Sequence, residues 1–351
     1  MKKIYTLFST VFLLLNVANA QDDVGVIAIT APVSGCALTT TETVTINIFN
    51  YGSTDLTAVP FIVEYTVNGG PPVSEVVSFT PFLPSTTVSY SFIIPADLSA
   101  AGTYTLTATT LLTIPPDANN TNDAVTGYLV TNSPPTVGGT VSASATVCSG
   151  TNSGTVTLAG ETGSVLQWEQ SIDGGFTWTP IVNTTTSHTY NNLVVTTMFR
   201  ALVQSGTCAS ANSTDVTITV DPVSVGGAVT ANANVCSGSN AGVLTLAGET
   251  GSVLMWQFST DGGFTWTNIV NTTNSQTYLN LIITTMYRAV VQSGVCASAN
   301  STPATITVDP ISVGGTVSSN ALVCEGSNSG TLTLSGQTGS VINWEYSIDG
   351  G

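Results

Sequence analysis

The stretch SVLQWEQSIDGGFTW spans residues 164–178, and SVLMWQFSTDGGFTW spans residues 252–266. Side chains two positions apart share a face of a β-strand. This period predicts a strand in which Leu166, Trp168 and Gln170 share one face, followed by a tight turn at the Asp-Gly-Gly tripeptide. We therefore expect Trp168 to be a core residue of a central strand rather than part of a binding surface.

The two stretches belong to a longer repeat. Residues 134–221 and 222–309 align without a gap, and 63 of the 88 positions are identical. The tryptophan recurs at the same step as Trp256 and Trp344, and we expect both to occupy the same core position. A fixed period of this length indicates an array of similar modules. Catalytic groups are rarely duplicated in tandem, whereas spacers, stalks and multivalent binders often are.

Residues 310–351 repeat the first 42 positions of the unit. Half of a β-sandwich leaves an apolar face and unpaired strand edges open. We therefore expect this truncated third repeat to be poorly ordered or only partly sandwich-like.

Residues 1–20 have the pattern of an export signal peptide. Lys2 and Lys3 precede an apolar run, and small residues at 18–20 supply a cleavage site. The apolar run is too short to span a bilayer. The sequence thus predicts a chain that is exported to the cell surface or the extracellular space, with no membrane insertion in this segment.

The charge balance limits the classes of partner. Once the two amino-terminal lysines are removed, Arg200 and Arg288 face twenty acidic residues, which is a net charge of −18. Nucleic acids and anionic membranes require clustered Lys and Arg. Both are therefore excluded as expected partners, and the acidic excess is interpreted as a means of keeping the surface soluble.

The composition predicts an all-β protein, because β-branched residues are plentiful and Gly and Pro punctuate short runs. Residues 21–133 form a non-repeated module with alternating segments at 43–48, 61–67, 88–92 and 103–107. Their period and spacing fit a seven-strand sandwich. Short Pro-containing links between modules predict a fairly extended, semi-rigid string.

The amino-terminal module resembles the CARDB-like and related immunoglobulin-like domains of secreted bacterial proteins. The motifs that carry the resemblance are Glu42–Asn50, Tyr65–Gly70, Leu98–Tyr104 and Asp117–Asp123. The resemblance implies a β-sandwich fold and an extracellular setting, and it implies no chemistry.

The repeat resembles the immunoglobulin-like modules found in tandem in large bacterial surface proteins, including adhesins associated with gliding motility and type IX secretion. The matching positions are Val147–Gly150, Leu158, Gly163–Val165, Trp168, Asp173–Gly175, Thr196–Val203, Gly206–Cys208 and Val216–Val220. The resemblance implies tandem immunoglobulin-like sandwiches in an extended row.

Paired, evenly spaced cysteines in an exported chain predict disulfides. Cys148 and Cys208 lie 60 residues apart, as do Cys236 and Cys296. We expect each pair to close within its own repeat, which the chain-entropy model values at roughly 4 kcal/mol. A bridge between neighbouring repeats, such as Cys208 to Cys236, is the alternative.

Two cysteines have no assigned partner. Cys36 lies in the amino-terminal module, and Cys324 lies in the third repeat, whose second cysteine falls beyond the sequence. No two cysteines are close in sequence and there is one histidine, so the sequence predicts no metal site and no cofactor.

The hairpin of each repeat resembles the Asp-box, a structural turn motif of sialidases and other propeller proteins. The Asp side chain of such a turn accepts hydrogen bonds from turn amides, and glycine permits positive φ. The matching residues are Ser171, Asp173, Gly175, Thr177 and Trp178, and in the second copy Ser259, Asp261, Gly263, Thr265 and Trp266. The resemblance implies a structural role away from any catalytic centre, and exposed tryptophans here would make sugar binding the alternative.

Other chemistry finds little support in the sequence. His188 is replaced by Gln276 in the next copy, so no repeated Ser-His or Cys-His mechanism depends on it. Asp221 and Asp309 at the joints are the candidate ligands for a stiffening Ca²⁺, but no acidic cluster accompanies them.

These observations favour a non-catalytic structural or adhesive segment, a stalk or adhesin built from repeats. Its expected partner is a surface ligand, either a glycan or another cell-surface protein. Two alternatives remain: an accessory region of a secreted hydrolase whose catalytic domain lies beyond residue 351, and repeated weak carbohydrate-binding modules acting by avidity.

Overall fold

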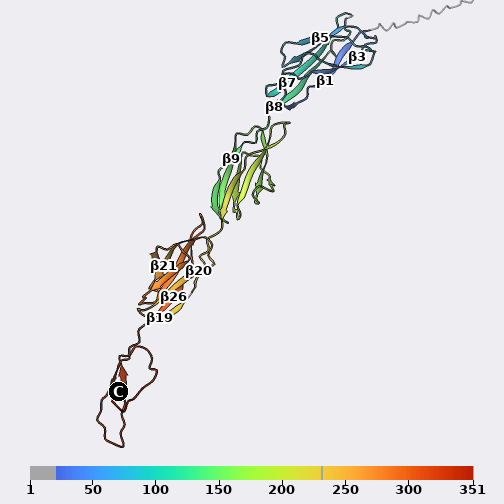
Figure 1. The fold of residues 1–351 in the computed structure, drawn as a ribbon. Coiled ribbons are helices and arrows are strands. Elements are labelled where there is room, and N and C mark those ends of the chain that lie inside the picture. Colours follow the sequence, from blue (N-terminus) through green and yellow to red (C-terminus); the bar gives the residue numbers. More distant parts are fainter. Residues whose placement is uncertain (1–20, 115, 231, 351) are drawn as a thin grey trace, which may run out of the picture.

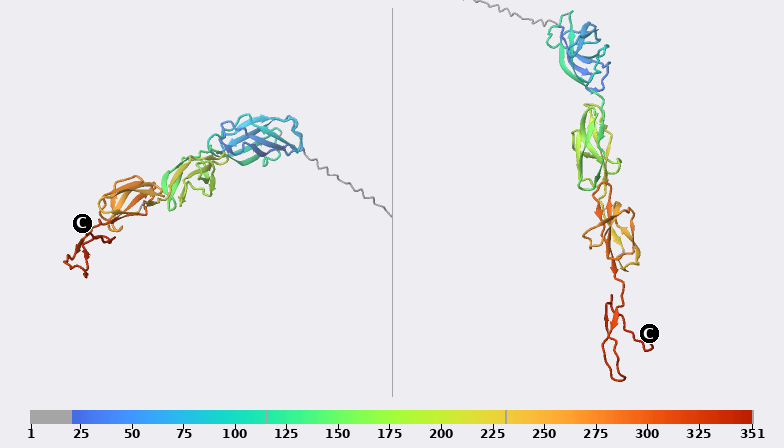
Figure 2. Two further views of the ribbon diagram at one scale, coloured as in Figure 1. Left: turned by 60° about the horizontal axis from the view of Figure 1, so that its bottom comes forward. Right: turned by 90° about the vertical axis from the view of Figure 1, so that its left-hand side faces the viewer.

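The computed structural model describes residues 21–114, 116–230 and 232–350. The expected signal peptide lies outside these residues. Figures 1 and 2 show the β-sheet modules end to end in an extended row. The described residues contain strands and turns but no helix, and therefore no helix long and apolar enough to cross a membrane. The prediction of an all-β fold made of tandem sandwiches is confirmed.

The amino-terminal module is a sandwich of two sheets. A three-stranded sheet has the order β1-β3-β6, and a five-stranded sheet has the order β2-β8-β7-β4-β5. The strands are β1 (Val24–Ala31), β2 (Gly35–Cys36), β3 (Thr45–Asn50), β4 (Phe61–Val67), β5 (Val73–Val77), β6 (Thr87–Ser91), β7 (Gly102–Leu111) and β8 (Ala124–Ser133).

The core of this module follows the period-two pattern of its strands. In β3, Ile46, Ile48 and Asn50 are buried while the residues between them are half-buried. Asn50 is satisfied in the interior because its amide donates to backbone carbonyls and its Oδ1 accepts from the amide of Gly52. β4 and β5 form a hairpin through Asn68 and Gly69, both of which have positive φ.

The first repeat is also a two-sheet sandwich. One sheet has the order β14-β11-β9, and the other has the order β10-β17-β15-β12-β13, with β16 paired to β15. The strands are β9 (Thr140–Ser142), β10 (Ala145–Cys148), β11 (Ser153–Ala159), β12 (Ser164–Ser171), β13 (Thr179–Ile181), β14 (Ser187–Asn191), β15 (Thr197–Gln204), β16 (Ala211–Asn212) and β17 (Val216–Asp221).

The second repeat has the same elements about 88 residues later, with sheets β18-β20-β23 and β19-β26-β24-β21-β22 and with β25 paired to β24. The strands are β18 (Ala228–Thr230), β19 (Ala233–Cys236), β20 (Ala241–Ala247), β21 (Ser252–Ser259), β22 (Thr267–Ile269), β23 (Ser275–Leu279), β24 (Thr285–Gln292), β25 (Ala299–Asn300) and β26 (Ala304–Asp309).

Both repeats have an immunoglobulin-like arrangement. A short strand near the start of each repeat pairs in parallel with the last strand of the same repeat. In the first repeat, β10 runs parallel to β17 and Cys148 faces Asp221. The tryptophans of β12 and β21 are fully buried between the sheets. Their indole N–H groups donate to the carbonyls of Thr185 and Thr273, so no buried donor is left unpaired.

A β-bulge changes the phase of the tryptophan strand. The pairing of β12 with β15 shifts between Val165 and Gln167, so Val165 is buried while Leu166 is 44% exposed. The expectation that Leu166 shares the buried face with Trp168 is therefore wrong. A bulge places one extra residue in a strand and reverses the alternation beyond it.

The third repeat contains only one short hairpin among its described residues, β27 (Thr316–Ser318) paired with β28 (Thr333–Ser335). Trp344 is 55% exposed, so it does not occupy the expected core position. Trp168 is enclosed by side chains from β15 and β17, and the described residues of the third repeat contain no counterparts of those strands.

Candidate functional site

Three features of the array could carry function: the hairpins, the junctions between modules and a pocket on the side of the second repeat.

In the hairpin of the first repeat, the Ser171 hydroxyl donates to Asp173 Oδ1 at 2.7 Å and accepts from the amide of Gly175 at 2.9 Å. Asp173 accepts from the amide and the hydroxyl of Thr177. The second hairpin has the same bonds between Ser259, Asp261 and Thr265. The carboxylate thus organises the turn.

These bonds stabilise the charged form of the aspartate. The hydroxyl of Thr177, then its backbone amide, lowers the pKa of Asp173 to about 2. The same contacts from Thr265 lower the pKa of Asp261. Both glycines of each Asp-Gly-Gly turn have positive φ, which a residue with a Cβ adopts only with strain. The geometry is that of a structural turn.

The hairpin tryptophan is held from two sides. Trp178 Nε1 donates to the carbonyl of Gly175 at 3.0 Å. The Arg200 guanidinium lies 4.0 Å from the centre of the indole ring, and its Nε donates to Glu169 Oε2 at 2.7 Å. A cation over an indole face is an attractive contact. Trp178 is half-buried as a result, and one face of its ring is already in use.

The second repeat reproduces this stack with one difference. Arg288 lies 4.1 Å from the ring centre of Trp266, but its Nε donates to Gln257 Oε1, a neutral acceptor. The two arginines of residues 21–351, one in each repeat, thus serve the same internal contact. The most exposed aromatic residues of the hairpins are instead Phe176 and Phe264, each 90% exposed.

The cysteines join different modules. Cys36 of the amino-terminal module is bonded to Cys208 of the first repeat. Cys148 of the first repeat is bonded to Cys296 of the second repeat. Cys236 and Cys324 are free and exposed. The prediction that Cys148 pairs with Cys208, and Cys236 with Cys296, is therefore wrong, and so is the alternative bridge from Cys208 to Cys236.

The physical reason is the position of the two cysteines along the sandwich. Cys148 ends β10 beside Asp221, at the carboxyl-terminal end of the repeat. Cys208 follows β15 at the opposite end, where its Sγ lies 3.2 Å from the carbonyl oxygen of Pro134. A strand of eight residues such as β15 spans about 26 Å. A disulfide requires Cα atoms within about 7 Å, so the two cysteines of one repeat cannot meet.

The junctions also contain direct polar contacts. The amide of Val295 donates to Asp221 Oδ2 at 3.0 Å, which connects the last strand of the first repeat to the β24–β25 turn of the second. The carboxylate proposed from sequence as a calcium ligand is thus already engaged by the next module. Among residues 21–114, 116–230 and 232–350, no three His, Cys, Asp or Glu side chains gather as a metal would require.

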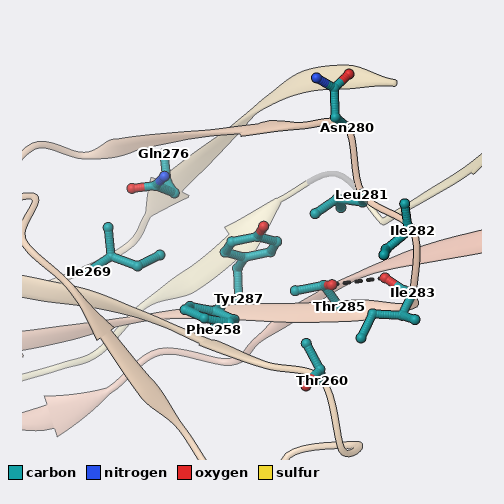
Figure 3. Close-up of a pocket in the computed structure, with 10 residues that line it drawn as sticks. All are labelled: Phe258, Thr260, Ile269, Gln276, Asn280, Leu281, Ile282, Ile283, Thr285 and Tyr287. Carbon is teal, nitrogen blue, oxygen red and sulfur yellow. Dashed lines mark hydrogen bonds between the residues drawn. The ribbon is translucent and has the colours of Figure 1, made fainter. Parts of the chain in front are cut away.

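A pocket of about 330 Å³ opens on the side of the second repeat, between its two sheets (Figure 3). Tyr287 lies at its centre with Phe258 beside it, and the loop after β23 forms its rim. The lining residues are Phe258, Thr260, Ile269, Gln276, Asn280, Leu281, Ile282, Ile283, Thr285 and Tyr287. The pocket is largely apolar with a few polar groups, as small-molecule sites commonly are.

This pocket was not predicted from the sequence. Six of its ten lining positions differ from the first repeat, although most positions of the two repeats are identical. In the first repeat the corresponding space is about 200 Å³ and is lined by His188 and Phe199. Burial lowers the pKa of His188, whose ring centre lies 5.3 Å from that of Phe199. The concentration of differences between the two repeats at these positions was the sequence signal that could have indicated the pocket.

The fold and the junctions define a tandem array of immunoglobulin-like β-sandwiches that disulfides link end to end. The chain belongs to a family described as a domain of unknown function (DUF8696), whose model matches residues 137–222, 225–310 and 313–351. No protein with a curated description matches the chain.

Several solved structures of immunoglobulin-domain tandems are similar to the chain at low identity. One, described as the structural basis for Dscam isoform specificity, is 10% identical with a TM-score of 0.31, covering 82% of this chain and 72% of that one. Sidekick-1 immunoglobulin domains 1–5 are 12% identical with a TM-score of 0.33 and coverages of 84% and 60%. Drosophila OTK extracellular domains 3–5 are 11% identical with a TM-score of 0.30 and coverages of 82% and 97%.

Proposed function

We propose that this chain is a non-catalytic structural and adhesive segment, a stalk or set of adhesin repeats, of an exported bacterial cell-surface protein. The observation that carries the proposal is that both disulfides among the described residues run from one module to the next. Bonds from each module to the next restrain the geometry of the row, which matters most when the row itself has a mechanical or positioning role.

Three further features support this reading. The resemblance of the two module types to CARDB-like and gliding-motility adhesin domains favours export and the cell surface. Disulfides persist in oxidising compartments outside the cytoplasm. The aspartates of the Asp-box-like hairpins are engaged in internal hydrogen bonds of the turn.

The extended row is tested by small-angle X-ray scattering of residues 21–351 under oxidising conditions, beside a variant with Cys36, Cys148, Cys208 and Cys296 all replaced by serine. The oxidised chain is expected to scatter as a stiff rod. The serine variant is expected to keep folded modules but to show a broader distribution of end-to-end distances. A compact oxidised particle, or turnover of a substrate by the purified chain, would contradict the proposal.

The partner is proposed to be a glycan or another cell-surface protein, bound weakly at several repeats. Half-exposed Trp178 and Trp266 are the side chains that favour glycans, because indole rings stack on sugars. Binding on a glycan array should disappear when both become alanine. The matched control replaces the equally repeated Phe176 and Phe264, which are exposed but not stacked on arginine. Loss in the control alone would transfer the binding role to the hairpin tips.

A further inference from the structure

The carboxyl-terminal ends of all three complete modules present a cysteine in the same setting. Cys36 faces Ser133 in the parallel pair of β2 and β8. Cys148 faces Asp221 in the pair of β10 and β17. Cys236 faces Asp309 in the pair of β19 and β26. The first two of these cysteines are bonded to the following module, whereas Cys236 is free.

One backbone hydrogen bond fixes this setting in each module. The residue after the cysteine donates its amide to the carbonyl of the last strand residue at 2.9 Å, and this holds for Ala37 to Ser133, Ser149 to Asp221 and Ser237 to Asp309. The position of the cysteine is therefore set by the module that carries it. The second repeat has the same arrangement at its carboxyl-terminal end, although its Cys236 is not bonded to another cysteine.

At each of the two bonded ends, the following module supplies its cysteine from a Ser-Gly-x-Cys turn. The backbone amide of Cys208 donates to the carbonyl oxygen of Ser205, and that of Cys296 donates to the carbonyl oxygen of Ser293, both at 2.9 Å. Close approach explains the glycine: a Cβ on Gly206 would lie 2.0 Å from Ser133 Oγ, and one on Gly294 would lie 1.8 Å from Asp221 Oδ2. The turn is thus shaped against the residue that faces the receiving cysteine.

We infer that Cys236 and Asp309 form a receiving half-site for the Ser-Gly-x-Cys turn of a complete repeat joined in the same chain. This inference rests on the proposed function as a row of linked modules. The occupant is expected in the same chain because residues after Asp309 already start a repeat: the bridge of Val313 to Thr338 matches that of Val225 to Thr250. Cys236 would then bond to the cysteine of that turn.

The chemistry is a two-electron oxidation. A new Sγ–Sγ bond forms between the two cysteines, which together lose two protons and two electrons. A disulfide oxidant, either a thiol–disulfide oxidoreductase or a small-molecule disulfide, accepts them and is reduced to two thiols. No other group in the chain is consumed.

The test inserts a second copy of Pro222–Asp309 directly after Asp309 in the full chain. The copy is a whole repeat with a core of its own, and the exposed substitutions Ser239→Thr and Ser298→Thr mark its peptides. The oxidised protein is alkylated and its peptides are mapped without reduction. In the unmodified chain, Cys236 and Cys324 should be alkylated.

In the lengthened chain, the original Cys236 should lose its reactivity and appear bonded to Cys296 of the copy, while Cys236 of the copy becomes the reactive one. Replacing Cys296 of the copy by serine should restore alkylation of the original Cys236. The inference is overturned if the copy closes its own two cysteines, or if the original Cys236 stays reactive.

A copy of residues 134–221 inserted at the same place guards against misfolding of one insert, because it carries its own Ser-Gly-x-Cys turn. Failure of both copies to bond Cys236 would sink the inference. Peptide mapping detects the disulfide of Cys236 and is independent of the shape of the row, which scattering measures. The cross-link can therefore form while scattering contradicts the rod, and the rod can hold while Cys236 stays free.

Discussion

The two complete repeats have nearly the same sequence and the same sandwich, but they are linked differently. The first repeat is bonded at both ends, through Cys208 and Cys148, whereas the second is bonded only through Cys296. Trp168 and Trp256 are nevertheless equally and fully buried. The comparison shows that each sandwich is specified by its own core and that the cysteines organise the row instead.

The largest expected effect comes from breaking the bond between the two repeats. We expect Cys148→Ser with Cys296→Ser to lower the free energy of unfolding of the second repeat by roughly 4 kcal/mol. While the first repeat stays folded, this bond closes residues 222–296 into a loop and so restricts the unfolded second repeat. The first repeat should lose less, because the bond of Cys36 to Cys208 still restrains it. Hydrogen exchange in denaturant, measured on peptides from β15 and β24, distinguishes the two repeats.

The matched control is Cys236→Ser, which removes a free thiol of the same repeat and should leave both values unchanged. Equal losses in the two repeats would break the comparison, since they would show that the linkage does not act module by module.

A smaller effect is expected from the arginine contact beside the hairpin. Arg200 pairs with the charged Glu169, whereas Arg288 pairs with the neutral Gln257. Partly exposed ion pairs contribute up to about 1 kcal/mol, and salt screens them. Glu169→Gln should therefore lower the stability of the first repeat by about 0.5 kcal/mol at low salt. The loss should shrink at high salt, as measured by denaturant unfolding.

Gln257→Glu is the reciprocal change and should stabilise the second repeat by a similar amount. A loss from Glu169→Gln that is the same at low and high salt would indicate that the hydrogen bond, and not the charge, stabilises the hairpin.

The smallest expected effect is a pH dependence that distinguishes the first repeat from the second. Burial lowers the pKa of His188 below its unfolded value, so the unfolded state binds a proton first as the pH falls. Stability is therefore fully present above about pH 6.5, the ordinary His value, and decreases as the pH drops below it. Gln276 occupies this position in the second repeat, which should show no such step.

His188→Gln should remove the step, as followed by melting temperature between pH 7 and pH 5. The acidic residues of the hairpins do not interfere in this range, because hydrogen bonds from Thr177 lower the pKa of Asp173 to about 2. A step that persists in the glutamine variant would have to be assigned to another group.

Much of the fold was predictable from local pattern. The strand that contains Trp168, the inward face of Phe199, Ala201 and Val203, and the period of 88 residues all follow from side-chain alternation and repetition. The bulge beside Leu166 was not predictable, because an extra residue in a strand leaves no mark in a short run of apolar residues.

The functional features were harder to predict because they depend on contacts between modules. Sequence spacing suggested pairing of Cys148 with Cys208, yet these residues lie at opposite ends of one sandwich. Their true partners come from neighbouring modules, and only the end-to-end packing brings them together. The pocket around Tyr287 likewise combines β21 to β24, so no single stretch of sequence announces it.

The crossed order of the two bonds has a consequence for tension. A load applied at Cys36 and Cys296 need not pass through the 260 residues that separate them along the backbone. It can cross to Cys208, follow 60 residues back to Cys148 and cross again to Cys296. At about 3.5 Å per extended residue, the tether between these points is limited to about 200 Å instead of about 900 Å. Between these two points, unravelling could therefore extend the row to only about a quarter of the length that the backbone alone would allow.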